Sequence, residues 1–440
     1  MENKAAKNPG FSKYFVRTFI IGLGLFSLSL MDPLYNTYVP LYLRRYIKAN
    51  FLVGGIMTLD NILQLLLIPV IAVWSDRTRT RIGRRMPFIA VMLPVSALLF
   101  HMVPIMAGVS LWALIIIIFF FNIFKTSVRG PVVALMPDTI PGEYRSEANG
   151  VISMMGGVGV ITGTLLLTRL IVIKDGLPFS AAGICTILAV VVLLLFVREG
   201  PPDSAPENWE KEKTEKKLSV AASIREVFSP ARGQGEKDYS APLILVSLFF
   251  WFMAYEGLQP FLGLYLVEVI GVAESNAALA QGVAGISGVA LAIPSGYAAH
   301  RLGRRRFIRI CLVFLTVILL MVPFSTDFVL RQGFSINACL LIFLLLMFLY
   351  GTVWIGVMVN SFPMIWQMTN YDNVGIYTGL YYTFSQSAAI FAPPITGLII
   401  DLGGYRGIFI FSGICMFAAW CTMGGVKTGE PDDRPVAPVS

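Results

Sequence analysis

The chain has 440 residues, of which 56% are hydrophobic and only 14% are charged, and its mean hydropathy is +0.72. Because no soluble fold of this length buries so much apolar surface, the composition excludes a water-soluble globular protein and indicates a membrane protein. The formal net charge of +8 does not indicate a nucleic-acid partner, since the basic residues stand in short loops beside apolar runs, where they set membrane topology.

Apolar runs long enough to span a bilayer, which takes roughly 20 residues, recur along the whole chain. The sequence predicts twelve such helices, at about 18–43, 51–74, 87–108, 111–134, 147–171, 180–197, 241–268, 277–299, 307–325, 337–362, 375–400 and 406–425. A polar stretch, Arg198 to Ser240, separates the sixth run from the seventh and contains an amphipathic piece around Leu218–Phe228. We therefore expect an all-α membrane protein with a six-helix lobe at 1–197, a cytoplasmic linker at 198–240 and a second six-helix lobe at 241–440 that ends in a short cytoplasmic tail.

Lys and Arg are distributed unevenly between the two sides of this arrangement. If the N-terminus is cytoplasmic, the segments on the opposite side hold only Arg44, Arg45, Lys48, Arg169, Lys174, Arg331 and Arg406. The positive-inside rule therefore predicts that both termini are cytoplasmic and that the protein lies in the inner or plasma membrane. The five cysteines all fall in apolar runs without metal-ligand spacing, and we interpret them as small buried hydrophobic residues.

Two basic loops occupy equivalent places in the two halves of the chain. The first runs from Ser75 to Arg85 and contains Asp76, Gly83 and Arg84; the second runs from His300 to Arg306 around Gly303. Each joins the second and third helices of its half. Such a duplicated half is typical of two-lobed membrane transporters.

With these loops in view, the chain resembles the major facilitator superfamily, and its first half resembles the glycoside–pentoside–hexuronide cation symporters, especially the branch shared with plant sucrose–proton symporters. The matching residues are Ser75-Asp76-Arg77, Gly83-Arg84-Arg85-Met86-Pro87-Phe88-Ile89, Gly130-Pro131, Ala134-Leu135, Asp138, Arg145-Ser146-Glu147-Ala148-Asn149-Gly150 and Met155-Gly156-Gly157. The resemblance implies a two-lobed fold with a central cavity and sugar transport driven by a cation.

Three positions depart from the pattern of those families. Val133 stands where the sucrose branch has an arginine, and Arg129 lies one turn earlier. Gln64 stands one turn after Asp60, where the melibiose-type group has a second carboxylate, which weakens the case for sodium coordination. His300 replaces an acid in the second basic loop.

Five ionisable residues lie well inside the predicted spans, where each costs about 2.5–3.5 kcal/mol to insert: Asp32, Asp60, Lys125, Arg129 and Glu256. The acids outnumber the bases, so the set invites a proton or a bound cation. Asp32, just before Pro33, is our first candidate for the proton-coupling carboxylate, followed by Glu256 and then Asp60. The alternative for Asp32 is a static ion pair with Lys125 or Arg129.

A sugar requires amide and hydroxyl partners at its edge and aromatic rings against its apolar face. The candidate substrate-binding residues are Tyr35, Asn36, Gln64, Asn122, Lys125, Arg129, Trp251, Tyr255, Gln259, Trp354, Asn360, Tyr381, Tyr382 and Gln386. The alternative is that these side chains serve packing and interhelical hydrogen bonds.

The resemblance implies a cytoplasmic gate built from the loop charges and the helix ends beside them. Its candidate residues are Asp76, Arg77, Gly83, Arg84, Arg85, Asp138, Arg145, Arg301, Gly303 and Arg304. The alternative is that the loop charges only set the orientation of the helices in the membrane. This explains the arginines but neither Asp76 nor Gly83.

The sequence thus predicts a functional monomer that imports a neutral di- or oligosaccharide or glycoside together with a proton. No enzyme site, metal site or cofactor is expected beyond the co-transported proton, with Na⁺ as a variant. The alternative hypotheses are transport of a drug, nucleoside or organic anion, and sugar sensing without transport.

Overall fold

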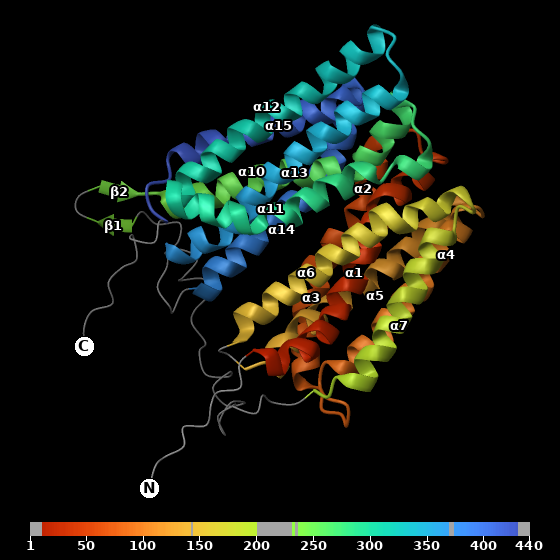
Figure 1. Cartoon of the computed structure of the whole chain (residues 1–440), viewed down its shortest axis with the longest axis vertical. Coiled ribbons are helices and arrows are strands. Elements are labelled where there is room, and N and C mark those ends of the chain that lie inside the picture. The colour runs from red at the N-terminus through yellow and green to blue at the C-terminus, as the bar shows by residue number, and fades with distance from the viewer. Residues whose placement is uncertain (1–10, 142–143, 200–230, 234–235, 369–373, 430–440) are drawn as a thin grey trace. The chain divides into compact units, whose positions relative to one another are not determined.

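The computed structural model describes residues 11–141, 144–199, 231–233, 236–368 and 374–429 (Figure 1). Eleven helices in these ranges are long and apolar enough to cross a membrane, or twelve if Glu274–Ala292 and Pro294–Leu302, bent by 58°, form one span. The predicted all-α membrane architecture is confirmed. The predicted amphipathic piece at Leu218–Phe228 lies outside the described residues.

The helices of the first half of the chain follow the predicted runs, and α1 and α5 extend several residues beyond them. They are α1 (Ser12–Arg44), α2 (Asn50–Met57), α3 (Leu59–Arg77), α4 (Met86–Ala107), α5 (Leu111–Thr139), α6 (Arg145–Ile161) and α7 (Leu177–Phe196). The run predicted as one helix at 51–74 is interrupted at Thr58, which separates α2 from α3. After α6 the chain continues as a π-helix, η2 (Thr162–Leu166), and a 3₁₀ helix, η3 (Leu167–Val172).

The second half of the chain is also built mainly of long helices. It comprises α10 (Ser240–Tyr265), η4 (Leu266–Ile270), η5 (Glu274–Asn276), α11 (Leu279–Leu302), α12 (Arg304–Arg331), α13 (Ile336–Gln367), α14 (Val374–Gly403) and α15 (Arg406–Gly424). Two three-residue antiparallel strands, β1 (Ala231–Gly233) and β2 (Glu236–Asp238), precede α10. Serine caps start α5 and α13, because Ser110 and Ser335 accept hydrogen bonds from the N–H groups of Ala113 and Ala338.

By their contacts, the residues form two compact units, with one boundary between Glu215 and Lys216, inside the predicted linker, and two more inside the predicted first lobe. The first unit comprises Met1–Leu34 and Leu63–Glu215, and the second comprises Tyr35–Ile62 and Lys216–Ser440. The two boundaries inside the first lobe fall directly after Pro33-Leu34 in α1 and four residues after Thr58, that is, near a proline and near a helix break. The segment 35–62 therefore belongs to the bundle formed by the second half of the chain.

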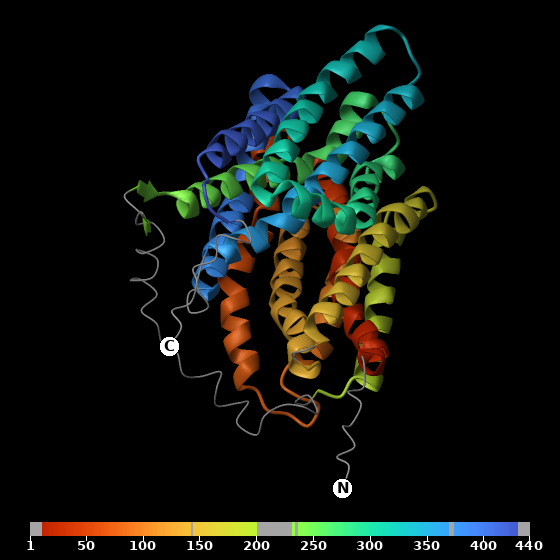
Figure 2. The same ribbon diagram turned by 60° about the vertical axis from the view of Figure 1, so that its left-hand side comes forward.

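Each unit has a core of large side chains. In the first unit, Phe100 packs against Phe121 and Phe179, with ring centroids 5.0 and 4.7 Å apart. In the second, α10 lies against α14 and α15, and α13 lies against α11 and α12 (Figures 1 and 2).

All five cysteines are free thiols; Cys311, Cys339 and Cys415 are buried as expected, whereas Cys185 is half-buried and Cys421 is exposed. The burial expected for these last two is wrong, because an apolar helix in a membrane also presents residues to lipid.

Candidate functional site

Two of the three ionisable residues predicted inside the spans of the first unit form an ion pair. Lys125, on α5, contacts the carboxylate of Asp32, on α1, and its ammonium also lies 5.6 Å from the ring centroid of Phe121. The Lys125 side chain is 7% exposed and that of Asp32 is 33% exposed. The pairing partner left open by the sequence is thus Lys125, and the more accessible member of the pair is the carboxylate.

The other polar candidates of this unit surround the pair to different degrees. Asn122 lies one turn before Lys125 on α5 and is fully buried, whereas Arg129 lies one turn after it and is exposed. Gln64, on α3, is half-buried. The helical spacing therefore places an amide, an ammonium and a guanidinium in sequence along α5, from buried to exposed.

The second unit carries a stack of three aromatic rings at membrane depth. Trp354 and Tyr350 lie one turn apart on α13, and Tyr255 reaches Trp354 from α10. The Tyr255 and Trp354 rings are nearly parallel, with centroids 4.5 Å and planes 5° apart, and the Tyr350 ring is parallel to Trp354 at 6.4 Å. Trp354 is buried between these neighbours, whereas Tyr255, on α10, is half-buried.

Several predicted polar contacts are committed to packing. Asn360 donates its amide N–H to the Gly356 carbonyl on its own helix at 2.8 Å. The Tyr381 hydroxyl lies 3.1 Å from that of Ser361, and its ring stacks on Phe362 with centroids 3.8 Å apart. The buried positions of Asn360 and Tyr381 favour the packing interpretation for both.

The remaining candidates of the second unit differ in burial. Trp251 and Tyr35 are fully buried; Asn36, Asp60, Glu256, Gln259 and Gln386 are half-buried; Tyr382 is exposed. The main-chain carbonyl of Gln259 accepts a hydrogen bond from the side chain of Gln281, so α10 and α11 are joined at this level. Glu256, next to Tyr255, places a carboxylate beside the aromatic stack.

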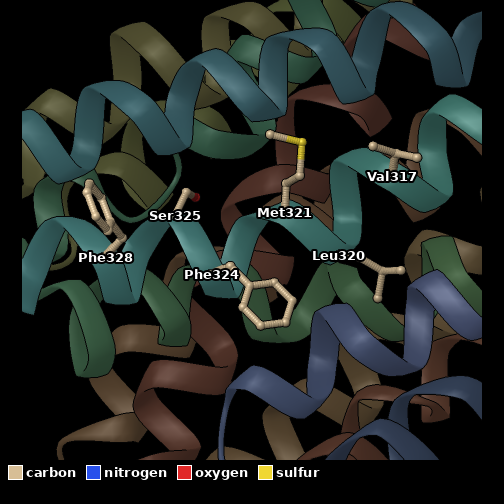
Figure 3. Close-up of a pocket in the computed structure, with 6 residues that line it drawn as sticks. All are labelled: Val317, Leu320, Met321, Phe324, Ser325 and Phe328. Atoms are coloured by element: carbon tan, nitrogen blue, oxygen red, sulfur yellow. The ribbon is translucent and has the colours of Figure 1, made fainter.

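A hollow on α12 is of a different kind. Figure 3 shows it lined by Val317, Leu320, Met321, Phe324, Ser325 and Phe328, which follow one face of the helix. Phe324 and Phe328 are exposed, and the hydroxyl of Ser325 is satisfied by the Val322 carbonyl at 2.9 Å. Because its lining residues offer no spare polar group, this hollow suits lipid chains and cannot recognise a hydrophilic solute.

The first basic loop closes a charge network at the ends of three helices of the first unit. The Asp138 carboxylate accepts from Arg84 Nε and Arg85 Nε, both at 3.0 Å, and Arg84 Nη2 lies 2.8 Å from its other oxygen. Arg85 also contacts the carboxylate of Asp76 and the hydroxyl of Ser75. Arg84, Arg85 and Asp138 are largely buried, so these pairs act in a weakly screened environment.

Glu199, which lies outside every motif recognised in the sequence, completes this network. It follows α7, and its Oε2 accepts from the backbone N–H groups of Arg85 at 2.7 Å and Met86 at 3.1 Å, so it caps the N-terminus of α4. Burial disfavours the charged guanidinium of Arg84, but Asp138, Asp76 and Glu199 outweigh this and raise the pKa of Arg84 above its usual value. An acid directly after a helix, on the same predicted side as an arginine-rich loop, was the available signal.

The other predicted gate residues are placed around helix ends. Arg145 donates to the carbonyl of Pro137 at 2.9 Å, which satisfies a carbonyl at the end of α5, and Arg77 is exposed. In the second loop, Gly303 has φ of +83°, Arg301 is exposed and Arg304 is half-buried. There, Arg305 donates to the carbonyls of Val426 and Lys427, at 2.9 and 3.1 Å, beyond the end of α15. Arg84 and Arg85 of the first loop thus contact carboxylates, whereas Arg305 of the second loop contacts backbone carbonyls.

Comparison with known proteins identifies the family to which the chain belongs. The sequence pattern of the Major Facilitator Superfamily matches residues 21–387. The chain belongs to this superfamily. As a member of the Major Facilitator Superfamily with many membrane-spanning helices, it is a membrane transporter and not an enzyme.

One curated relative and several solved structures are similar to this superfamily member. The general alpha-glucoside permease of Schizosaccharomyces pombe (strain 972 / ATCC 24843) is 28% identical over 224 residues, which cover 47% of this chain and 39% of the permease. The chain thus matches well under half of that relative's length. A mutant of the nucleoside transporter NupG has a TM-score of 0.71 at 12% identity, and the match covers 94% of this chain and 100% of that transporter. A bacterial homologue of the human lysosomal transporter Spinster, in an inward-facing and occupied conformation, has a TM-score of 0.68 at 14% identity. The match covers 97% of this chain and 99% of that homologue. These two structures show the fold alone.

Proposed function

We propose that this transporter imports a neutral sugar, a di- or oligosaccharide or glycoside, together with a proton. It would lie in the inner or plasma membrane with both termini in the cytoplasm and act as a monomer. The observation that carries the proposal is the ion pair between Asp32 and Lys125 in the first unit.

The ion pair offers a way to couple a proton to a sugar. When Asp32 is ionised, it occupies the ammonium of Lys125. Protonation of Asp32 weakens this ion pair, and a largely buried ammonium is destabilised when it loses an ionic contact. Sugar hydroxyls can then accept hydrogen bonds from Lys125, and the amide of Asn122 lies one turn away. Proton and sugar therefore stabilise each other's binding, which is the thermodynamic requirement for symport.

Two further observations support a sugar as the substrate. The Tyr255–Trp354–Tyr350 stack presents a rigid aromatic platform beside the carboxylate of Glu256, a combination suited to a ring with one apolar face and polar edges. The similarity to a general alpha-glucoside permease favours α-glucosides such as maltose or sucrose as first probes.

Purified protein in proteoliposomes tests the proposal. A thermal-shift screen against sugars and nucleosides, at two pH values with and without sodium, identifies the ligand, because a ligand that binds the folded state raises Tm. Uptake of that sugar is then measured with an inward proton gradient and no sodium. Accumulation above equilibrium supports proton symport. Accumulation only with a sodium gradient would replace the proton by sodium, and a Tm response to nucleosides but to no sugar would overturn the sugar assignment.

A further inference from the structure

One carboxylate of the second unit caps a helix that lies far from it in sequence. Asp401, at the end of α14, accepts hydrogen bonds from the backbone N–H of Asn50 at 2.8 Å, the side-chain amide of Asn50 at 2.9 Å and the backbone N–H of Phe51 at 2.9 Å. These groups open α2, whose preceding residue, Ala49, supplies no capping side chain. The N–H groups at a helix start have no intrahelical partner and favour an anion, so Asp401 provides what the local sequence lacks.

The same segment, residues 35–62, is held to the second unit at other points. Arg44 donates to Glu268 through Nε at 3.1 Å and Nη2 at 3.3 Å, in a two-point contact. The hydroxyl of Tyr405 donates to the side-chain oxygen of Asn50 at 3.3 Å. At the other end of α2, the side chain of Thr58 donates to the carbonyl of Ile390 at 3.0 Å. These contacts join α1, α2 and Thr58 to η4, to α14 and to the turn after α14.

The backbones of α2 and α14 approach so closely that only glycine fits at two positions. A Cβ on Gly54 would lie 2.2 Å from the carbonyl oxygen of Pro393, and one on Gly397 would lie 2.2 Å from that of Asn50. Both obstacles are backbone atoms, which cannot rotate aside as a side chain can. Substitution of either glycine is therefore compatible only with an arrangement in which α2 and α14 have separated.

We propose that the Asp401 cap on α2, with the glycine contacts beneath it, is the latch that keeps the non-cytoplasmic side of this transporter closed. The inference rests on the proposed function, since alternating access requires that side to open, and on the predicted orientation, which puts Arg44, Asn50 and Asp401 at that side. Opening requires residues 35–62 to leave α14, and Asp401 then loses all three donors at once. Because a charge-assisted cap is stronger than a neutral hydrogen bond, this one residue biases the equilibrium between closed and open states.

Cysteine labelling from outside tests the latch without any sugar. Thr37, fully buried in α1 beside Gly263 and Gln281, is replaced by Cys in a chain whose five native cysteines are changed to Ala. A membrane-impermeant maleimide added to right-side-out vesicles reports opening. Asp401→Ala should raise the labelling rate about tenfold, the factor expected when a charged cap is removed from one of two states. An unchanged rate would overturn the proposal.

Asp327→Ala is the matched control. It removes an ion pair at the same predicted side, to Arg406 at 2.6 Å, but this pair joins α12 to the start of α15 and does not involve α2. Its labelling should equal that of the parent; equal acceleration by Asp327→Ala and Asp401→Ala would mean general loosening and would overturn the latch. If Asp401→Ala does not fold, Gly397→Ala must accelerate labelling for the latch to stand. Labelling that responds as expected in a protein that transports no sugar would support the latch and reject the proposed substrate.

Discussion

Glu199 lies directly against Gly83. A Cβ on Gly83 would be 2.3 Å from the Glu199 carboxylate oxygen and 2.5 Å from its Cβ, and Gly83 has φ of +115°, a conformation that other residues rarely adopt. The turn of the first basic loop is therefore shaped around the acid that caps α4. Glycine is required here both by backbone conformation and by space.

Gly83→Ala should destabilise the protein, because it combines left-handed backbone strain of about 1–3 kcal/mol with a displaced cap on α4. The measurement is thermal unfolding in detergent. Gly150→Ala is the control, since a Cβ at Gly150 in α6 meets nothing within 4 Å and alanine favours a helix. Equal Tm values for the two variants would contradict the role assigned to the turn.

Asp138→Ala should be the most damaging change in the loop network, costing about 3–5 kcal/mol, because it leaves Arg84 and Arg85 buried without their shared carboxylate. Asp76→Ala serves as its comparison. The Asp76 side chain is 55% exposed, so its pair with Arg85 should contribute only about 0–1 kcal/mol. Unfolding of the two variants in parallel measures the difference, and a larger loss for Asp76→Ala would refute this ranking.

Asp32→Asn should abolish accumulation driven by a proton gradient while sugar counterflow persists. The amide is neutral, as a protonated carboxyl group is, so Lys125 stays available to sugar but no proton can be loaded or released. Gradient-driven uptake and counterflow in the same proteoliposomes separate the two effects. Unchanged accumulation in the variant would remove Asp32 from coupling.

Tyr255→Ala should raise KM for the sugar about 5–10-fold, or ~1–1.4 kcal/mol, because it removes the ring that stacks on Trp354. Tyr255→Phe keeps the ring and should stay close to the parent. Initial rates of uptake over a range of sugar concentrations provide both values. If Tyr255→Phe raised KM as much as Tyr255→Ala, the sugar would contact the Tyr255 hydroxyl and not the face of its ring.

The spanning helices could be predicted because apolar length alone identifies them, but their ends could not. The span predicted at 307–325 is observed as Arg304–Arg331, since the helix continues past the apolar run to Asp327, whose charge is balanced by Arg406. The break at Thr58 was not foreseen either. Apolar runs report burial in lipid or protein and say little about where hydrogen bonding is interrupted.

The contacts of the candidate site could not be predicted from the sequence where the two partners lie far apart along the chain. The charges at Asp32 and Lys125 were identifiable because ions are rare in apolar runs, yet only the fold selects Lys125 over Arg129 as the partner. Glu199 and Asp401 escaped notice because each stands at the end of a span, where acids are common in sequence. Their importance comes from unsatisfied N–H groups at helix starts 114 and 351 positions away, which no local pattern reveals.

The membership of residues 35–62 in the second unit has a consequence for biosynthesis. This stretch leaves the ribosome long before α14, the helix it covers, so the second bundle must wait for α14 while α2 is already made. A polypeptide started at Ser240 would expose the glycine surface of α14 around Gly397. Separately expressed halves should therefore need each other to mature, with the early fragment completing the fold of the late one.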